Sequence, residues 1–187
     1  MKISALTLVA LLYACGLFAG EATLAIDRSR SHVEAMVRLS LENFTASLTA
    51  YEALISVDVA EKRIVNAQLK FRVADVKTGS EKRDADMGRW EQTDQFPECV
   101  YILDALLPAA GGTFKARGKL ILHGVTQELV FPVTISFKAP NVCSLDGDLT
   151  LNTTDFGLPQ IRKFGLFKVN PELQVKFHLE GHAAPDS

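Results

Sequence analysis

The sequence has no run of basic residues and no excess of charge of either sign. Lys and Arg together number 20, Asp and Glu number 22, and the formal net charge is −2. Proteins that bind nucleic acid or anionic surfaces through charge need a basic patch or stripe. The composition therefore argues against a nucleic-acid-binding protein, and we expect no such partner.

Cysteine is scarce, with three residues in a chain of 187. Cys15 falls in an apolar N-terminal stretch, which leaves Cys99 and Cys143 for the rest of the chain. An oxidising compartment would permit a disulfide between these two, but two cysteines far apart in sequence do not predict one. Their pairing stays open, and the alternative for Cys99 is a buried thiol.

Motifs for catalysis and metal binding are missing as well. The sequence has no Gly-x-Ser-x-Gly elbow, phosphate-binding glycine loop or dinucleotide fingerprint. Its four histidines do not occur in the His-x-His or Glu-x-x-His spacings of metal sites. The acidic and basic residues of the segment 83–86 are interpreted as an exposed charge cluster that ties a helix to the rim of the fold rather than a catalytic carboxylate pair. We expect no enzyme activity, no cofactor and no metal.

The longest apolar run is confined to the first twenty residues. Lys2 is the only charge there, and residues 3–19 are apolar or small throughout. A short basic start followed by an apolar stretch is typical of a secretory signal, whereas a single span of about 17 residues is marginal for a membrane helix. We predict a signal peptide over residues 1–22, one domain over residues 23–187, and a periplasmic or secreted location.

An alternative for this end of the chain involves Cys15. Leu12-Tyr13-Ala14-Cys15 resembles the cleavage site of a bacterial lipoprotein, in which the thiol carries lipid. Tyr13 is bulky for that pattern, and the apolar stretch continues beyond the cysteine. Signal cleavage is therefore preferred, and a lipoprotein anchored through Cys15 is kept as the alternative.

What the chain has in quantity is alternation of apolar and polar residues. A period of two is typical of strands that bury one face and expose the other. The pattern is cleanest in residues 33–41, 65–73, 129–137 and 173–180. Further strand candidates are residues 47–59, whose apolar parity changes near residues 51–54 as at a bulge, and residues 99–107, 113–122 and 148–154.

Two features interrupt the strands. Thr78 and Ser80 offer capping groups before a charged segment, which predicts a helix over residues 81–91. Pro132 lies inside a strand pattern, so we expect it at an unpaired edge, a bulge or a gap in the ladder. Residues 157–171 are predicted to be irregular, because turn residues are frequent there.

About eight antiparallel strands with short connections leave two architectures, a sandwich or an up-and-down barrel. Sustained alternation over about ten residues favours the barrel, with a height of roughly 25 Å. An eight-stranded barrel encloses a space that side chains can just fill, or that can hold one small ligand. The 11 phenylalanines are equally compatible with a solid core and with a ligand pocket lined by their rings.

The motif His123-Gly124-Val125-Thr126 and several weaker stretches resemble those of the YceI-like family of periplasmic lipocalin-like proteins associated with polyisoprenoid binding. They occur in the family's order and cover nearly all of the chain after the signal. The most specific is His123-Gly124-Val125-Thr126, which follows a predicted strand. The others are Ile26-Asp27 with Ser31-His32-Val33, Val76-Lys77-Thr78-Gly79, Lys82-Arg83-Asp84-Ala85-Asp86, Phe96-Pro97, Lys119-Leu120-Ile121-Leu122 and Thr154-Asp155-Phe156-Gly157.

This resemblance implies an all-β, eight-stranded antiparallel lipocalin-like barrel with one short helix between strands. It implies a long apolar chain bound inside, without catalysis or metal. Residues 87–95 depart from the family's usual leucine- and aromatic-rich run, and Trp90 is therefore expected to reshape the mouth. His123 and Thr126 are interpreted as residues that fix the turn between two strands.

The leading hypothesis is an exported, non-catalytic carrier or store for a polyisoprenoid, a quinone precursor or another long-chain amphiphile. Loading would involve contact with a membrane surface, and homodimer formation is left open. The apolar tail would contact inward residues, and a polar head would lie near Trp90 at the mouth. The predicted ligand-binding residues are Phe71, Val73, Trp90, Phe131, Val133, Ile135, Phe156, Phe164 and Phe177.

Two other functions remain open on the sequence alone. A structural or interaction module of the cell envelope would have a solid core and an exposed apolar patch. An enzyme acting on a lipid or peroxide would need a reactive group inside the barrel, and Cys99 is the candidate for it.

Overall fold

Antiparallel strands make up most of the fold, in a computed structural model that describes residues 21–39, 43–139, 141–163 and 167–185. One α-helix and three short 3₁₀ turns (η) connect them. In chain order the elements are β1 (Glu21–Ile26), β2 (His32–Leu39), β3 (Asn43–Leu48), β4 (Glu52–Asp58), β5 (Arg63–Arg72), η1 (Val73–Asp75), β6 (Val76–Lys77), α1 (Glu81–Trp90), β7 (Glu98–Pro108), η2 (Ala110–Gly112), β8 (Phe114–Leu122), β9 (Val125–Ala139), β10 (Val142–Asn152), η3 (Thr153–Phe156), β11 (Arg162–Lys163) and β12 (Phe167–Pro185).

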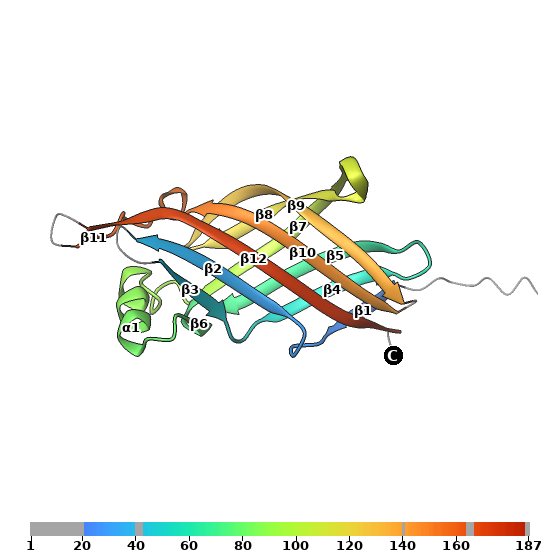
Figure 1. The fold of residues 1–187 in the computed structure, drawn as a ribbon, viewed down its shortest axis with the longest axis horizontal. Coiled ribbons are helices and arrows are strands. Elements are labelled where there is room, and N and C mark those ends of the chain that lie inside the picture. The colour runs from blue at the N-terminus through green and yellow to red at the C-terminus, as the bar shows by residue number, and fades with distance from the viewer. Residues whose placement is uncertain (1–20, 40–42, 140, 164–166, 186–187) are drawn as a thin grey trace, which may run out of the picture.

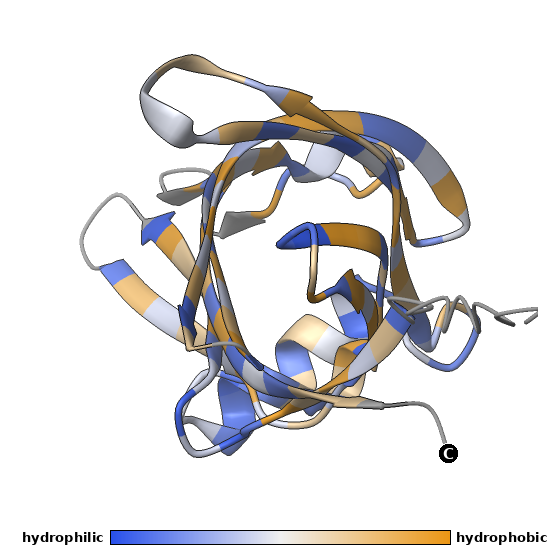
Figure 2. Cartoon of the chain, turned by 90° about the vertical axis from the view of Figure 1, so that its right-hand side faces the viewer, coloured by the Kyte–Doolittle hydropathy of each residue, from blue (hydrophilic) through white to orange (hydrophobic). Residues whose placement is uncertain are grey.

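The sheet closes on itself as an eight-stranded barrel. Neighbouring strands follow the order β1-β4-β5-β7-β8-β9-β10-β12, and β12 pairs back with β1. Viewed down its long axis the barrel is a closed ring (Figure 2). Closure leaves few free strand edges, which is why a small all-β protein gains from it. The predicted eight-stranded antiparallel barrel with one helix is confirmed.

Two positions in the ring are each formed by two strands that follow one another in the chain, β1 with β2 and β3 with β4. The long β12 pairs with β1 from Pro185 to Gly181 and with β2 from His178 to Val169. Likewise β4 continues the position of β3, because β3 pairs with β2 and β4 pairs with β1 and β5. Residues 47–59 are therefore not one bulged strand, as their pattern predicted, but two strands separated at residues 49–51.

The inner face follows the predicted alternation in most strands. On β9 the buried or half-buried residues are Leu129, Phe131, Val133 and Ile135, and the intervening Val130, Pro132 and Thr134 are exposed. At the start of β5 the residue that faces the core lies one position before the predicted one. A register shift between Ser56 and Val57 of the partner strand β4 places Ile64, 7% exposed, in the core, where the alternation predicted Val65.

Helix α1 lies at one end of the barrel (Figure 1). Ser80 caps it, because its hydroxyl oxygen accepts a hydrogen bond from the Arg83 amide, and Glu91 ends it. The prediction of a helix over residues 81–91 is thus confirmed to within one residue. No helix in the described ranges has the length and apolarity that crossing a membrane requires.

The barrel wall has a seam between β9 and β10. Their pairing runs from Ala139 and Val142 to Val133 and Gly147 and goes no further along the described strands. Beyond that point β9 pairs only with β8, and β10 only with β12. Pro132, which cannot donate to a ladder, stands where the seam begins, as its place in the strand pattern predicted. A small cavity of about 190 Å³ lies in the seam.

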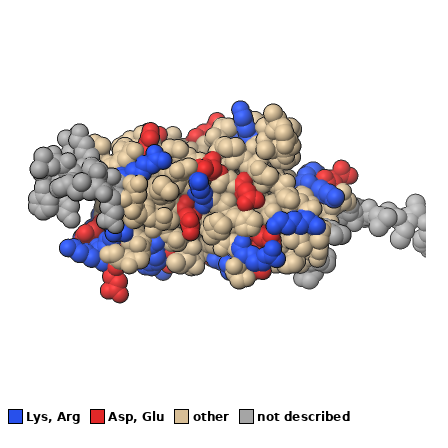
Figure 3. Space-filling model, in the orientation of Figure 1, with Lys and Arg blue, Asp and Glu red and all other residues tan. Residues whose placement is uncertain are grey.

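The outer surface carries charges of both signs. On the face seen in Figure 3, Lys and Arg side chains are interspersed with Asp and Glu. Ion pairs cross neighbouring strands, for example Lys70 with Glu98 at 2.8 Å. This distribution agrees with the near-neutral composition.

Candidate functional site

The middle of the barrel interior is lined by a layer of aromatic rings. Phe131 of β9 packs between Tyr101 of β7 and Phe177 of β12, with ring centroids 5.6 Å and 6.2 Å away. Val133 and Ile135 belong to the same cluster. The structure thus brings together the four residues that the sequence predicted for β9 and β12, and adds Tyr101, which it did not predict.

Glycines make room for these rings. A Cβ on Gly147 would lie 2.3 Å from the Phe177 ring, and a Cβ on Gly118 would lie 2.6 Å from the Tyr101 hydroxyl. Each aromatic side chain thus occupies the space beside a glycine on a neighbouring strand, where a Cβ would clash with it. A Gly-Phe cross-strand pair cannot be recognised in one sequence, because the register is set by the fold.

The inner face is not filled throughout. Leu69, Phe71, Ile135 and Phe177 face inward in a closed barrel and yet are half-buried rather than buried. Side chains in a close-packed core have almost no accessible surface. These residues therefore border space that a water-sized probe can reach, and the surface that they present to it is apolar.

The end of the barrel beneath α1 is more tightly packed. Val73, Cys99, Leu120 and Phe156 are buried in one cluster, against which Phe71 packs. Phe156 is 1% exposed, so it forms part of the barrel's end rather than an open mouth, where the sequence placed it. The turn of His123 and Gly124 is tied to this end, because His123 Nδ1 lies 3.1 Å from the Phe156 carbonyl oxygen and donates to it.

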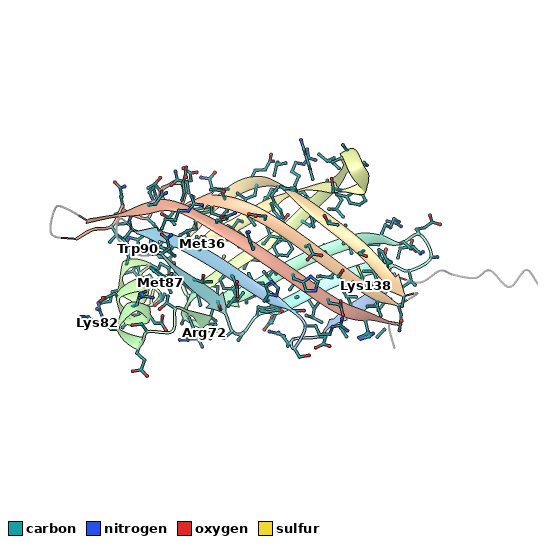
Figure 4. The ribbon with its side chains drawn as sticks, in the orientation of Figure 1. Met36, Arg72, Lys82, Met87, Trp90 and Lys138 are labelled. Atoms are coloured by element: carbon teal, nitrogen blue, oxygen red, sulfur yellow. The ribbon has the colours of Figure 1, made fainter. Side chains whose placement is uncertain are left out.

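Trp90 holds α1 in place at the same end. Its indole Nε1 donates a hydrogen bond of 2.8 Å to the Pro159 carbonyl oxygen, in the segment after η3. Figure 4 shows Trp90 and Met87 of α1 at the end of the barrel. Trp90 thus lies at this end of the barrel, and its contact with a ligand stays a prediction. Phe164, predicted as its neighbour, lies outside the described residues.

A cavity of about 580 Å³ separates α1 from η1 and β6. Glu91, at the C-terminal end of α1, lines it, and burial raises the pKa of this carboxyl to about 7. Its Oε2 atom is buried and has no hydrogen-bond partner among the described residues. No pattern in the sequence marked Glu91, since a glutamate after a charged helix is ordinarily exposed.

Three further buried polar atoms lack a partner within the described ranges. They are the hydroxyl oxygens of Tyr51 and Tyr101 and the Nε2 atom of His123. Burial raises the pKa of Tyr101 to about 12, so its hydroxyl is protonated and can donate a hydrogen bond. Unsatisfied buried polar groups are uncommon and ask for an explanation.

Both remaining cysteines are free thiols in the part of the chain that the structure describes. Burial and the nearby charge of Glu91 raise the pKa of Cys99 to about 12, and burial raises that of Cys143 to about 11. A buried thiol with a raised pKa is a poor nucleophile at neutral pH. Among the described residues, no group of three His, Cys, Asp or Glu side chains could hold a metal ion.

The opposite end of the barrel carries a buried carboxylate that is fully paired. Glu180 of β12 is 2% exposed and contacts Lys138 Nζ at 2.7 Å and Arg30 Nε at 2.8 Å. Chiefly the Lys138 hydrogen bond, and then the charge of Arg30, hold the pKa of Glu180 below its ordinary value. In the described barrel the two ends thus differ, with a satisfied carboxylate at one and an unsatisfied one at the other.

Known proteins share this architecture. The chain is 24% identical over 155 residues to a UPF0312 protein of Pseudomonas syringae pv. tomato, covering 76% of this chain and 81% of that one. The crystal structure of Burkholderia cenocepacia BcnA has a TM-score of 0.73 at 22% identity, covering 84% of this chain and 99% of BcnA. A polyisoprenoid binding domain from Saccharophagus degradans, implicated in plant cell wall breakdown, has a TM-score of 0.69 at 16% identity, covering 88% and 100%.

The same likeness is found at the level of the family. The family model that describes the YceI-like domain matches residues 24–181, which is nearly the whole barrel. The match begins in β1 and ends in β12, the two strands whose pairing closes the ring. This chain therefore belongs to the YceI-like domain family.

Proposed function

We propose that the protein is an exported, non-catalytic carrier or store for a long-chain apolar ligand of the polyisoprenoid or quinone-precursor type, held inside the barrel. The observation that carries the proposal is the accessible apolar surface on the inner face, at Leu69, Phe71, Ile135 and Phe177. The structural neighbour named as a polyisoprenoid binding domain supports the ligand class.

The energetics favour such a ligand. Burying about ten methylene equivalents against apolar side chains yields roughly 8 kcal/mol before the costs of association. No charged group is needed for this gain, and the central layer supplies aromatic and aliphatic contacts around Phe131 and Phe177. The raised pKa of Cys99 argues against the enzyme hypothesis, because a protonated buried thiol does not attack a lipid or peroxide.

The decisive experiment is native mass spectrometry of protein recovered from the periplasm of a bacterial host. We expect a bound mass that organic solvent extracts and that fragments as a prenyl chain. The variant Leu69→Trp, which adds bulk on the inner face, should lose most of this mass while still folding. Asn66→Trp, an exposed position on the same strand, is the matched control and should keep it.

The interaction-module alternative predicts the opposite result. With a solid core, the wild-type protein would carry no ligand, and Leu69→Trp would lower the free energy of unfolding by more than about 2 kcal/mol through overpacking. Ligand-free protein together with that loss of stability would overturn the carrier proposal.

Export is a separate part of the proposal and has its own test. Residues 1–20 lie outside the described ranges, so its support is the sequence of that segment. Fractionation of cells that express the full chain should place it in the periplasm. A lipoprotein would instead sediment with membranes and be released by Cys15→Ser, and retention in the cytoplasm would contradict both forms of export.

A further inference from the structure

Strands β7, β8 and β9 form a three-stranded unit that is joined to the rest of the barrel along only part of its length. Within the unit, β8 pairs with both β7 and β9 over nearly its whole length. On one side β7 pairs with β5 only over residues 98–102, and on the other side β9 pairs with β10 only over residues 133–139. In the described structure, residues 103–108 and 125–132 therefore have no strand partner on the outer edges of the unit.

The turn that joins β7 to β8 projects from the barrel wall, as the yellow-green segment of Figure 1 shows. It has no charged side chain, because its residues are Leu107-Pro108-Ala109-Ala110-Gly111-Gly112-Thr113. Leu107 is 41% exposed, and Pro108 and Ala110 are exposed as well. Exposed turns are usually polar, whereas apolar residues that cluster on a surface indicate a site of contact.

The outer face of the same unit combines exposed apolar side chains with cations. Of the five large hydrophobic side chains that are exposed in the described structure, three lie on this unit. Each lies directly opposite a cation of the central strand β8, with Leu107 opposite Lys115, Val130 opposite Arg117 and Ile102 opposite Lys119. Because residues two apart on a strand share a face, these cations form a stripe with apolar side chains on both sides.

The three cations of β8 have no ion-pair partner in the part of the chain that the structure describes. Two exposed carboxylates, Asp104 and Glu128, lie on the same unit, so that three cations face two anions. The remaining charges of the unit, Glu98 and Lys138, are paired with side chains of other strands. This face is thus slightly basic in a chain whose formal net charge is −2.

We infer that the outer face of β7, β8 and β9 and the turn at residues 107–113, together called the docking face, bind the surface of a lipid bilayer that contains anionic lipids. Apolar side chains of such a face enter the boundary between head groups and acyl chains, while neighbouring cations contact lipid phosphates. An uncharged turn enters this layer without the cost that a charged side chain would meet. The inference rests on the proposed function, because a carrier of a membrane lipid must reach a membrane to exchange it.

The docking face covers a stretch of the inner wall that retains accessible apolar surface. On its inner side the side chains of Leu103, Leu106 and Phe114 are half-buried. This stretch of β7 is also the one without a partner in β5. The α1 end differs, because Val73 and Phe156 belong to a buried cluster there. A ligand drawn from a bilayer at the docking face would thus meet accessible apolar surface just behind the turn.

The test is flotation of the purified protein with lipid vesicles. Vesicles of phosphatidylethanolamine and phosphatidylglycerol are compared with vesicles of phosphatidylcholine alone, and we expect the wild type to prefer the anionic ones. Lys115→Ser should weaken this binding about fivefold, as the loss of one cation near an anionic surface would. Leu107→Glu should weaken it at least about tenfold, because it places a charge where an apolar side chain enters the lipid.

The matched control for Leu107→Glu is Leu54→Glu. Leu54 is 59% exposed and lies on β4, outside the docking face. The same chemical change at this position should leave vesicle binding as in the wild type. Thermal unfolding of both variants checks that they are folded, since surface substitutions change stability little.

Tryptophan fluorescence reports which part of the molecule meets the lipid. Trp90 on α1 is the one tryptophan of the chain, and the double variant Trp90→Phe, Ala110→Trp moves it to the turn. In anionic vesicles that contain brominated acyl chains, we expect strong quenching of the tryptophan at position 110 and none of Trp90 in the wild type. Quenching of Trp90 without quenching at position 110 would overturn the inference and place α1 against the bilayer.

The outcomes separate this inference from the proposed function. Equal vesicle binding by the wild type, Leu107→Glu and Leu54→Glu would overturn the docking face, and so would the failure of the wild type to bind either kind of vesicle. In both cases the carrier function stands as long as protein recovered from the periplasm carries a prenyl mass. If that mass is absent as well, the proposed function fails too.

Discussion

At the scale of single residues, a substitution at Gly147 tests whether the Phe177 ring lies as close to the barrel wall as it does in the structure. The Phe177 ring occupies the place of a Cβ at Gly147, 2.3 Å from it. We expect Gly147→Ala to lower the free energy of unfolding by about 1–3 kcal/mol, because the ring must leave its position. Urea denaturation of the ligand-stripped protein measures the change.

A double variant makes this prediction specific. Phe177→Leu removes the ring, so Gly147→Ala should cost clearly less in that background than in the wild type. Residues in contact show such coupling, whereas independent sites add within about 0.5 kcal/mol. Additive effects would mean that Phe177 does not lie on Gly147.

Glu180 makes a residue-scale prediction about acid stability. Its pKa is held below the ordinary value of 4.5, chiefly by the hydrogen bond from Lys138. A lowered pKa in the folded state means that the stabilisation is complete above pH 4.5 and is lost as the pH falls below it. Glu180→Gln should therefore lower the Tm at pH 7 and flatten its dependence on pH in the acid range.

The control for Glu180 is Glu34→Gln, which changes an exposed carboxyl on β2. It should leave both the Tm and its acid dependence close to wild type, as most surface substitutions do. Equal effects of the two variants would indicate that Lys138 and Arg30 do not stabilise the buried carboxylate.

At the scale of elements, the position of α1 depends on a tether at its last turn. The Trp90 indole donates to the Pro159 carbonyl oxygen at 2.8 Å, and Trp90→Phe keeps an aromatic ring but removes this donor. We expect a loss of about 1 kcal/mol, confined to local opening of the helix. Hydrogen exchange followed by mass spectrometry should show faster exchange in residues 81–95 and little change in β8 or β12.

The comparison for Trp90→Phe is Lys82→Ala, an exposed position on the same helix. It should leave the exchange of residues 81–95 unchanged or slower, because alanine is the better helix former. Global acceleration of exchange in the Trp90 variant would show instead that the tether stabilises the whole barrel.

Strands and helices could be predicted where the local sequence pattern, alternation or capping residues, was regular. Alternation located β2, β5, β9 and the centre of β12, and capping residues located α1. Strand β10 begins at Val142, six positions before the prediction, because Asp146, Gly147 and Asp148 have the composition of a turn. In the structure Gly147 is needed beneath Phe177, a requirement that comes from the neighbouring strand.

At the scale of the whole molecule, the seam between β9 and β10 is a line along which the wall is only partly hydrogen-bonded. Along it the described strands lack a shared ladder beyond Val133 and Gly147. Backbone amides of residues 125–131 that point toward the seam should exchange faster than those amides of residues 133–139 that point toward β10 and are paired with it. Residue-resolved exchange by NMR measures this, and equal protection along β9 would contradict it.

The cavity in the seam reaches residues of the central cluster. Phe131 and Leu149, which belong to the central cluster, line the cavity in the seam. Addition of a prenyl ligand should slow exchange in residues 125–131 if the tail packs behind them. A ligand that protects only residues 81–95 would place the tail outside the barrel.

By itself the sequence determined the all-β class and favoured the barrel, because period two and turn residues act locally and most strands show in their own pattern which face is buried. It also determined most of the inner residues, including Phe131, Val133, Ile135 and Phe177. Only the tertiary structure decided which rings meet glycines, where the ladder between β9 and β10 ends, and that one carboxyl oxygen of Glu91 is buried. Those features depend on the register between strands and on how α1 sits over the end of the barrel, which no single segment encodes.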